Sequence, residues 1–277
     1  PYPPLFRSTP ESTKYLRDLF TKLAGWGYDY FKIDGQPIVV NEYRSKSEFM
    51  RKPAAADDAP ALYRKTLETV RAAIGPDRYL LGCWGIPLEG AGIMNGSRTG
   101  GDIVLGWGGF QVALRPTLQY FYLHNIVWYS DPDVLLVRSP LTLDQARVWA
   151  TLQGLTGQAL MSSDRLMDLS DERVELLRRV YPAVDIRPLD LFPTERYKRI
   201  WDLKINHLGR NYDVVGVFNF GTEKTEHTRL NWKELGVPSD QPVHVFDFWN
   251  REYLGAWSES MIRSEERRVG KECRSRW

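Results

Sequence analysis

Helix and strand patterns alternate along the first two thirds of this chain of 277 residues. The run PESTKYLRDLFTKLAGWG has a proline at its start, an apolar face and glycines at its end, and the strand pattern YDYFKID follows directly. About four such pairs succeed one another, with room for a helix between successive strands. Because parallel strands need long crossover connections, this alternation predicts an α/β fold with a parallel sheet or barrel.

The pattern changes at about Asp185. The runs RIWDLKIN, YDVVGVFNF, HTRLNW and PVHVFDFW are short, turn residues separate them, and no long helix pattern lies between them. Short strands at such spacing are typical of antiparallel sandwiches. We therefore predict an α/β domain over residues 1–184 and an incomplete β-sandwich domain over residues 185–262.

Local signals predict several element boundaries within the α/β part. Thr142 and Ser170 precede helix patterns and are expected to cap them. Pro116 lies in another helix pattern, ALRPTLQYFYLHN, and is expected near its start, because a proline inside a helix removes a hydrogen bond. The run QALMSSD is predicted to form a short strand.

The last segment, residues 263–277, reads RSEERRVGKECRSRW and shows no amphipathic period. It resembles an in-frame translation of a common sequencing adapter, and the alternative is a natural basic tail. The chain also starts in what reads as the middle of a protein, so we expect a bacterial gene fragment cut at both ends. The cellular compartment therefore stays open.

The charge and the cysteine content depend on that tail. It contributes six of the 37 Lys and Arg residues and three of the 35 Asp and Glu residues, so the remainder carries a net charge of −1 rather than +2. This balance gives no reason to expect nucleic acid or a membrane surface as a partner, and no apolar run is long enough to span a bilayer. Cys273 lies in the tail, and Cys83 alone cannot form an internal disulfide.

Charged residues interrupt the strand pattern YDYFKIDG, whose other residues are largely apolar or aromatic. Burying Lys32 or Asp34 is costly unless each finds a partner, so these residues need partners or take part in chemistry. Later strand patterns also end on polar groups, and in a parallel barrel such ends meet at one face. These later ends supply Cys83 and Trp84, Arg98 and Asp102, Asp131 and Asp133, and Ser162, Ser163 and Asp164. One of them alone would be interpreted as a helix cap, but together they predict a functional site.

The residue types at these strand ends favour carbohydrate chemistry. Two carboxylates that flank a glycosidic bond are what its hydrolysis requires. The chain has no HExxH motif, no paired CxxC and no histidine cluster, which leaves a metal site unsupported. It also lacks the GxSxG motif of serine hydrolases and the spacing of a Walker loop. Cys83 has no histidine near it in the sequence, so we interpret it as a buried structural cysteine rather than a nucleophile.

Four motifs occur in the order and spacing of one group of enzymes. YFKIDG, GCWGIPLEGAGIMNGSRTGGDI, SDPDVLLV and ALMSSD resemble the melibiase-like clan of glycoside hydrolases, the α-galactosidases and their relatives, and the resemblance covers residues 10–255 approximately. It implies a catalytic (β/α)8 TIM barrel followed by a C-terminal antiparallel β domain. This chain would supply roughly the last five strands of that barrel, and the missing strands would carry groups that grip the far hydroxyls of the sugar.

The resemblance also implies roles for the strand-end residues. Asp34 of the K-x-D motif would be the nucleophile, and Asp102 of the R-x-x-x-D motif would be the acid/base. Asp133 would lie behind the sugar site or at a subsite. The residues that would bind the sugar or line its site are Lys32, Arg98, Cys83 and Trp84. Lys32 would also hold Asp34 ionised, and neither a cofactor nor a metal ion is implied.

The implied activity is that of a retaining α-glycoside hydrolase of the α-galactosidase type, with a carbohydrate as its partner. Within the clan, the alternatives are an α-N-acetylgalactosaminidase, an α-glucan-cleaving enzyme and a galactosyl transferase. An inactive carbohydrate-binding relative is a further alternative, against which the presence of both Asp34 and Asp102 argues. We expect the isolated fragment to be inactive, and the sugar specificity and oligomeric state stay open.

Overall fold

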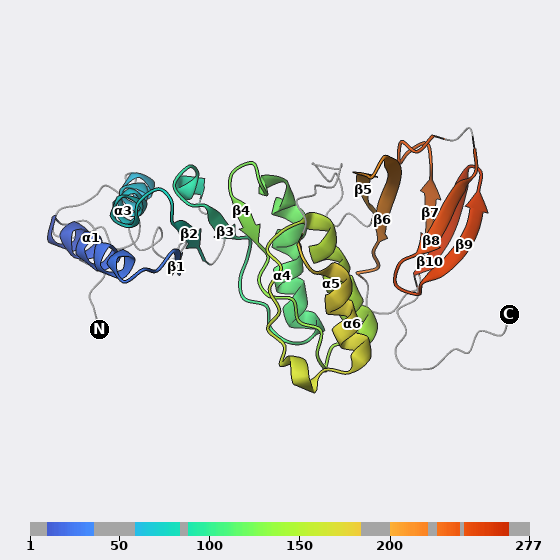
Figure 1. Cartoon of the computed structure of the whole chain (residues 1–277), viewed down its shortest axis with the longest axis horizontal. Coiled ribbons are helices and arrows are strands. Elements are labelled where there is room, and N and C mark those ends of the chain that lie inside the picture. Colours follow the sequence, from blue (N-terminus) through green and yellow to red (C-terminus); the bar gives the residue numbers. More distant parts are fainter. Residues whose placement is uncertain are drawn as a thin grey trace.

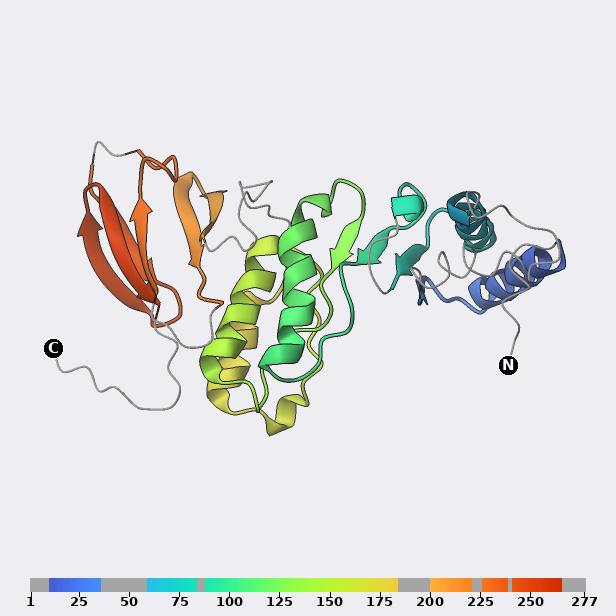
Figure 2. The same cartoon turned by 180° about the vertical axis from the view of Figure 1, so that it is seen from behind.

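The computed structural model describes residues 10–35, 59–83, 88–183, 200–220, 226–238 and 241–265. The elements follow one long axis, with the amino-terminal helices and strands at one end, a group of helices in the middle and antiparallel strands at the other end (Figure 1, Figure 2). A mixed α/β part is thus followed by a C-terminal β part, as predicted. None of the described helices is long and apolar enough to cross a membrane.

Parallel strands form the sheet of the α/β part, and they lie side by side in the order in which they occur along the chain. The strands are β1 (Tyr30–Ile33), β2 (Tyr79–Gly82), β3 (Gly96–Arg98) and β4 (Tyr129–Asp131). The helices are α1 (Pro10–Gly25), α3 (Ala59–Ile74), α4 (Trp107–Tyr120), α5 (Leu143–Thr156) and α6 (Asp171–Val180). This order confirms the predicted alternation of strands and helices.

Helices α1 and α3 cover one face of β1 and β2. Phe31 of β1 and Leu80 of β2 are buried in one cluster with Leu67 and Ile74 of α3. Because successive side chains of a strand point to opposite faces, the neighbours of Phe31 lie on the other face of the sheet. That second face carries the candidate site.

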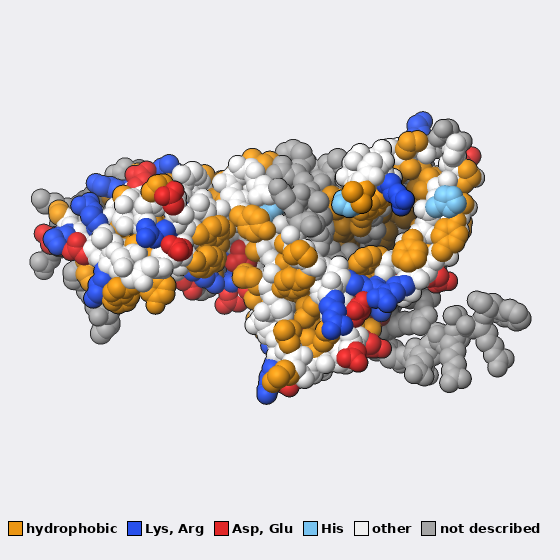
Figure 3. Space-filling model, viewed as in Figure 1, with side chains coloured by type: hydrophobic (Ala, Val, Ile, Leu, Met, Phe, Trp, Pro, Cys, Tyr) orange, Lys and Arg blue, Asp and Glu red, His pale blue; other side chains and the backbone are white. Residues whose placement is uncertain are grey.

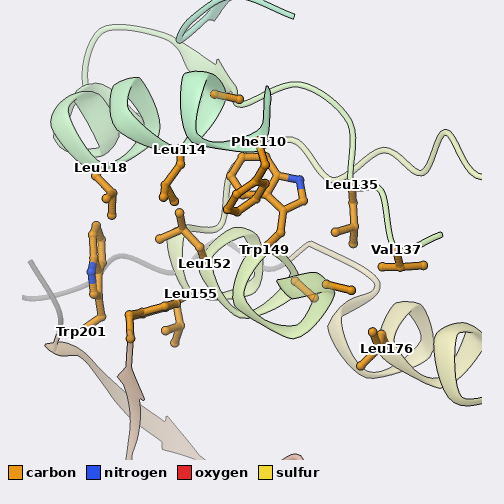
Figure 4. Packing of buried hydrophobic residues seen from close by; sticks show 14 of the residues in the cluster. Phe110, Leu114, Leu118, Leu135, Val137, Trp149, Leu152, Leu155, Leu176 and Trp201 are labelled. Carbon is orange, nitrogen blue, oxygen red and sulfur yellow. The ribbon is translucent and has the colours of Figure 1, made fainter. Parts of the chain in front are cut away.

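A second core lies among α4, α5 and α6 (Figure 4). Phe110 of α4 meets Trp149 of α5 edge-on, with the ring centroids 4.8 Å apart. Trp201 of β5 (Ile200–His207) joins this core and packs against Phe121 at a centroid distance of 4.5 Å. The core therefore extends across the boundary predicted between residues 184 and 185, and the division into two domains remains a prediction.

The helix caps follow the prediction in part. The Thr142 hydroxyl accepts a hydrogen bond from the amide of Gln145, whose side chain accepts one from the amide of Thr142, so this reciprocal pair caps the amino-terminal end of α5. Ser170 occupies the position before α6, but its side chain makes no capping bond.

Two other local predictions are corrected. Pro116 is not near the start of its helix, because α4 begins well before it at Trp107. Its ring packs against Gly100, where an added Cβ would lie 2.7 Å from the Pro116 Cγ atom. The run QALMSSD forms only an isolated bridge between Leu135 and Ser162 rather than a full strand.

Antiparallel pairs make up the C-terminal part and confirm the predicted change of pattern. The pairs are β5 with β6 (Arg210–Val217), β7 (Glu226–Asn231) with β10 (Ser260–Glu265), and β8 (Val243–Asp247) with β9 (Glu252–Trp257). Side chains from all three pairs pack around Leu230, Trp232 and Met261. Figure 3 shows hydrophobic side chains on the outer surface of this part as well. The assignment as a sandwich stays a prediction.

The last strand continues past the boundary predicted at residue 262. Residues 263, 264 and 265 belong to β10 and pair in register with Thr228, His227 and Glu226 of β7, respectively. Residues 266–277 lie outside the described ranges, so the interpretation of 263–277 as an adapter sequence stays a hypothesis.

Candidate active site

Alternation along β1 separates two kinds of side chain. Phe31 and Ile33 pack with the helices on one face. Tyr30, Lys32 and Asp34 lie on the opposite face, where all three are exposed. The charges that interrupt the strand pattern are therefore not buried in the helix-covered core, which answers how this strand tolerates them.

The strand register brings four strand-end residues into one row. Ile33 pairs with Gly82, and Gly82 pairs with Ser97, so the ends of β1, β2 and β3 are aligned. The next residue along each strand lies on the face away from the helices, and Arg98 at the end of β3 pairs with Asp131 of β4. The row across the sheet consists of Asp34, Cys83, Arg98 and Asp131.

Arg98 is the centre of a network of charges. Its Nε lies 3.3 Å from Asp131 Oδ2, its Nη1 3.0 Å from Asp102 Oδ1 and its Nη2 3.0 Å from Asp133 Oδ1. Arg98, Asp131 and Asp133 are buried, whereas the Asp102 side chain is 85% exposed. Burial alone would lower the pKa of Arg98, but Asp131 and Asp133 outweigh it and raise that pKa. The guanidinium therefore stays charged and holds Asp102 at the surface.

The corner that follows β4 holds the segment between β3 and α4. Asp133 Oδ2 accepts a hydrogen bond from the amide of Ile103 at 2.6 Å, and Asp131 Oδ1 accepts one from the amide of Asp133 at 2.8 Å. The backbone carbonyl of Asp131 accepts from the amide of Thr99 at 2.8 Å. Asp102 lies between these two attachment points.

Cys83 connects Asp34 to the surroundings of Arg98. Burial raises the pKa of the Cys83 thiol, the positive charges of Arg98 and Lys32 lower it, and Asp34 raises it through its charge and a side-chain hydrogen bond. Asp34 also accepts a hydrogen bond from the amide of Gly35 at 2.7 Å. Cys83 therefore lies between Asp34 and Arg98 in the row, and Arg98 in turn contacts Asp102.

Two tyrosines lie on the same face, nearer the start of the strands. Tyr30 and Tyr79 pair in register, and their rings stack with centroids 5.3 Å apart. Burial, and then the groups Tyr30, Asp131 and Tyr129, raise the pKa of Tyr79 to about 12. Neither tyrosine stands out in the sequence, although alternation in YDYFKID assigns Tyr30 to the face of Lys32 and Asp34.

Not every predicted strand-end residue joins this network. The buried Asp164 carboxylate accepts from the amides of Val137 at 2.7 Å and Arg138 at 3.3 Å, and it pairs with the Arg138 guanidinium at 3.0 Å. It holds the segment between β4 and α5 and does not cap a helix, because Val137 and Arg138 precede the start of α5 at Leu143. Trp84 lies outside the described residues. Over the described ranges, no group of His, Cys, Asp and Glu side chains is arranged to hold a metal ion.

Sequence comparison finds relatives among glycosidases. No family model matches the chain. The curated proteins named "Probable alpha-galactosidase A" from Aspergillus flavus and Aspergillus oryzae are each 26% identical over 251 residues, which cover 82% of this chain and 45% of theirs. The chain therefore spans about half the length of the curated relatives it matches.

Solved structures share the fold. A GH27 β-L-arabinopyranosidase from Geobacillus stearothermophilus gives a TM-score of 0.65 at 21% identity and covers 92% of this chain and 59% of its own. An isomalto-dextranase from Arthrobacter globiformis, complexed with panose, gives 0.61 at 13% identity, over 93% of this chain and 47% of its own. At these identities the likeness shows the fold alone. With the sequence relatives, it confirms the resemblance to the melibiase-like glycoside hydrolases.

Proposed function

We propose that this chain carries part of the catalytic barrel and the β domain of a retaining α-glycosidase of the α-galactosidase type. The observation that carries this function is the row of strand-end residues, in which Asp34 lies beside Cys83 and Arg98 pairs with Asp102 at 3.0 Å. Carboxylates that face one another across a cleft are what glycoside hydrolysis needs. Asp34 and Asp102 are both exposed at the strand ends, where a sugar could reach them.

We propose a partial (β/α)8 barrel, roughly its last five strands, for residues 1–184. The sequential parallel order of β1, β2, β3 and β4 supports this architecture, since the strands of such a barrel follow one another around its circumference. The exposed face of Tyr30, Lys32 and Asp34 would then point into the barrel. A β-sandwich domain over residues 185–262 and an adapter-derived tail over 263–277 complete the proposed organisation.

The proposed mechanism has two displacement steps. A carboxylate oxygen of Asp34 attacks the anomeric carbon, and the protonated carboxyl of Asp102 gives its proton to the leaving oxygen as the glycosidic bond breaks. The resulting Asp102 carboxylate then takes a proton from water, whose oxygen attacks the anomeric carbon and releases Asp34. Each step inverts the anomeric carbon, so the product retains the configuration of the substrate. Neither step calls for a cofactor.

Cations near the two carboxylates would bind the sugar. Lys32 precedes Asp34 by two residues on the same face of β1 and is exposed there, so its ammonium group is available to a sugar hydroxyl. Arg98 would act chiefly through Asp102, because its Nε, Nη1 and Nη2 atoms each already pair with a carboxylate. Cys83 and Trp84 would line the end of the strand beside the sugar.

The sequence relatives favour a terminal α-galactosyl group as the sugar. Since β-L-arabinopyranose has the ring configuration of α-galactose without its hydroxymethyl group, it is the competing substrate to compare first. The same panel of nitrophenyl glycosides should include α-N-acetylgalactosaminide and α-glucoside, and an acceptor alcohol would detect a galactosyl transferase. An inactive carbohydrate-binding relative would bind a sugar from this panel and cleave none.

Two variants of the barrel enzyme that contains this chain test the roles of the carboxylates. In Asp34→Gly, turnover of an aryl α-galactoside should be lost, and azide that enters from the vacated face should yield the β-galactosyl azide. In Asp102→Ala, an activated aryl group still leaves, the glycosyl-enzyme accumulates, and azide should yield the α-galactosyl azide. The same anomer from both variants, or full activity of Asp102→Ala on natural galactosides, would contradict the assignment.

A further inference from the structure

We propose that Asp133 is a positioning residue for the acid/base Asp102, and that it acts by tying together both ends of the segment that carries Asp102. This inference rests on the proposed function. One carboxylate makes both attachments, since Oδ1 pairs with Arg98 Nη2 at 3.0 Å and Oδ2 accepts from the amide of Ile103 at 2.6 Å. Arg98 comes four residues before Asp102, and Ile103 directly follows it.

Asp102 needs such support because its own side chain has little protein around it. Its side chain is 85% exposed, and one carboxylate oxygen pairs with Arg98 Nη1 at 3.0 Å. A catalytic group must be held within a fraction of an ångström of its productive position, and a misplacement of about 1 Å can cost about 10²-fold in rate. Asp133 can restrain the segment that carries Asp102, because Asp133 is itself buried and contacts both Arg98 and Ile103.

The backbone of Asp133 is in turn held by hydrogen bonds at both its amide and its carbonyl. Its amide donates to Asp131 Oδ1 at 2.8 Å, and its carbonyl accepts from Gln153 Nε2 of α5 at 3.3 Å. Its φ of 73° lies in the left-handed region, which is unfavourable for a residue with a side chain and persists only where the surroundings hold it. Such strain at a residue that contacts both ends of a catalytic segment supports a functional reason for this conformation.

Asp164 offers a matched control for Asp133. It is also a buried carboxylate that accepts from backbone amides and pairs with an arginine, but its partners are Val137 and Arg138. If Asp133 served stability alone, Asp133→Asn and Asp164→Asn should have the same consequences. If Asp133 positions Asp102, the two variants should differ in a way that depends on how much protonation the leaving group needs.

The decisive experiment compares phenyl and dinitrophenyl α-galactosides as substrates of the barrel enzyme that contains this chain. The phenyl group needs a proton to leave, whereas the dinitrophenyl group does not. Asp133→Asn should lower kcat/KM about 10²-fold for the phenyl substrate and leave kcat/KM for the dinitrophenyl substrate almost unchanged, because kcat/KM reports the first displacement, in which only the phenyl group needs the proton of Asp102. Asp164→Asn should show no dependence on the leaving group. An equal loss of kcat/KM on both substrates in Asp133→Asn would overturn the positioning role.

A second measurement needs no catalysis and uses the 277-residue chain itself. The variant Asp133→Ala should speed the hydrogen exchange of the Ile103 amide about tenfold, because that amide loses its acceptor, and the amide of Val137 should stay protected. The variant Asp164→Asn should leave the Ile103 amide unchanged. Unchanged exchange at Ile103 in Asp133→Ala would overturn the attachment. If the attachment holds but the parent enzyme cleaves no glycoside, the proposed function fails separately.

Discussion

Arg98 and Arg138 both pair with aspartates, but in the first cluster the arginine is buried, whereas in the second it is the aspartate. Arg98 is itself buried among three carboxylates, and one of them, Asp102, is exposed to solvent. In the other cluster the Asp164 side chain is completely buried, and Arg138 is 40% exposed. Backbone amides of Val137 and Arg138 satisfy the Asp164 carboxylate.

This difference in burial distinguishes an ion pair that only fixes a loop from one that can hold a carboxylate where a substrate reaches it. A carboxylate surrounded by backbone amides fixes a loop and presents nothing to a substrate. Around Arg98, two buried carboxylates already pair with Nε and Nη2 of the guanidinium. The third carboxylate can therefore face solvent while it stays attached to Nη1. A buried arginine with a surplus of carboxylates therefore positions an acid at a surface, and a buried aspartate with a half-exposed arginine does not.

The largest expected contrast between the clusters is in stability. Arg98→Leu should lower the free energy of unfolding by about 3–5 kcal/mol, because it leaves the buried Asp131 and Asp133 without their cation. Arg138→Leu should lower it by about 1 kcal/mol or less, because Arg138 is partly exposed and Asp164 keeps its backbone donors. Urea denaturation of the 277-residue chain and of both variants measures the difference. Equal losses would show that the Arg98 cluster is no more than a structural ion pair.

The sequence predicted those parts of the molecule that depend on local periodicity. The pattern YDYFKID forms β1 directly after α1, as predicted, and Thr142 caps α5 together with Gln145. Pro116 was beyond such reasoning, because its ring is accommodated inside α4 by contact with Gly100, a residue distant in the sequence. Tertiary packing there outweighs the local preference of proline.

The candidate site was predictable as a set of strand ends but not as a network. Strand order brings Asp34, Cys83, Arg98 and Asp131 to one row, and the alternation of elements was enough to expect this. Which carboxylate each guanidinium nitrogen faces depends on side-chain directions and on the corner after β4. The pairing of Asp133 with both Arg98 and the Ile103 amide carries no signature in the sequence.

A smaller effect is expected on the pKa of Cys83, which lies between Asp34 after β1 and Arg98 of β3. With Cys273 replaced by Ser throughout, Asp34→Asn should lower the pKa of Cys83, because it removes a negative charge and a carboxylate that accepts from the thiol. Titration of the ultraviolet absorbance of the thiolate measures this shift. Arg138→Leu should leave the pKa of Cys83 unchanged, and an identical response to both substitutions would remove the distinction between the two clusters.

A last effect concerns Tyr79, whose pKa is raised to about 12 from an ordinary 10.0 by burial and then by Tyr30, Asp131 and Tyr129. Since the raised pKa favours the neutral phenol in the folded state, its contribution to stability is complete below pH 10 and is lost as the pH rises toward 12. Tyr79→Phe should therefore lose less stability than the parent chain over that interval, measured by denaturation at successive pH values. The difference in phenolate absorbance between the two chains reports the titration of Tyr79 itself.

In that titration, Asp131→Asn should lower the pKa of Tyr79, whereas Asp164→Asn should not, because Asp131 is among the groups that raise this pKa and Asp164 is not. A phenolate that forms near pH 10 in the parent chain would show that the Asp131 carboxylate and the burial at Tyr79 do not act together on this face of the sheet.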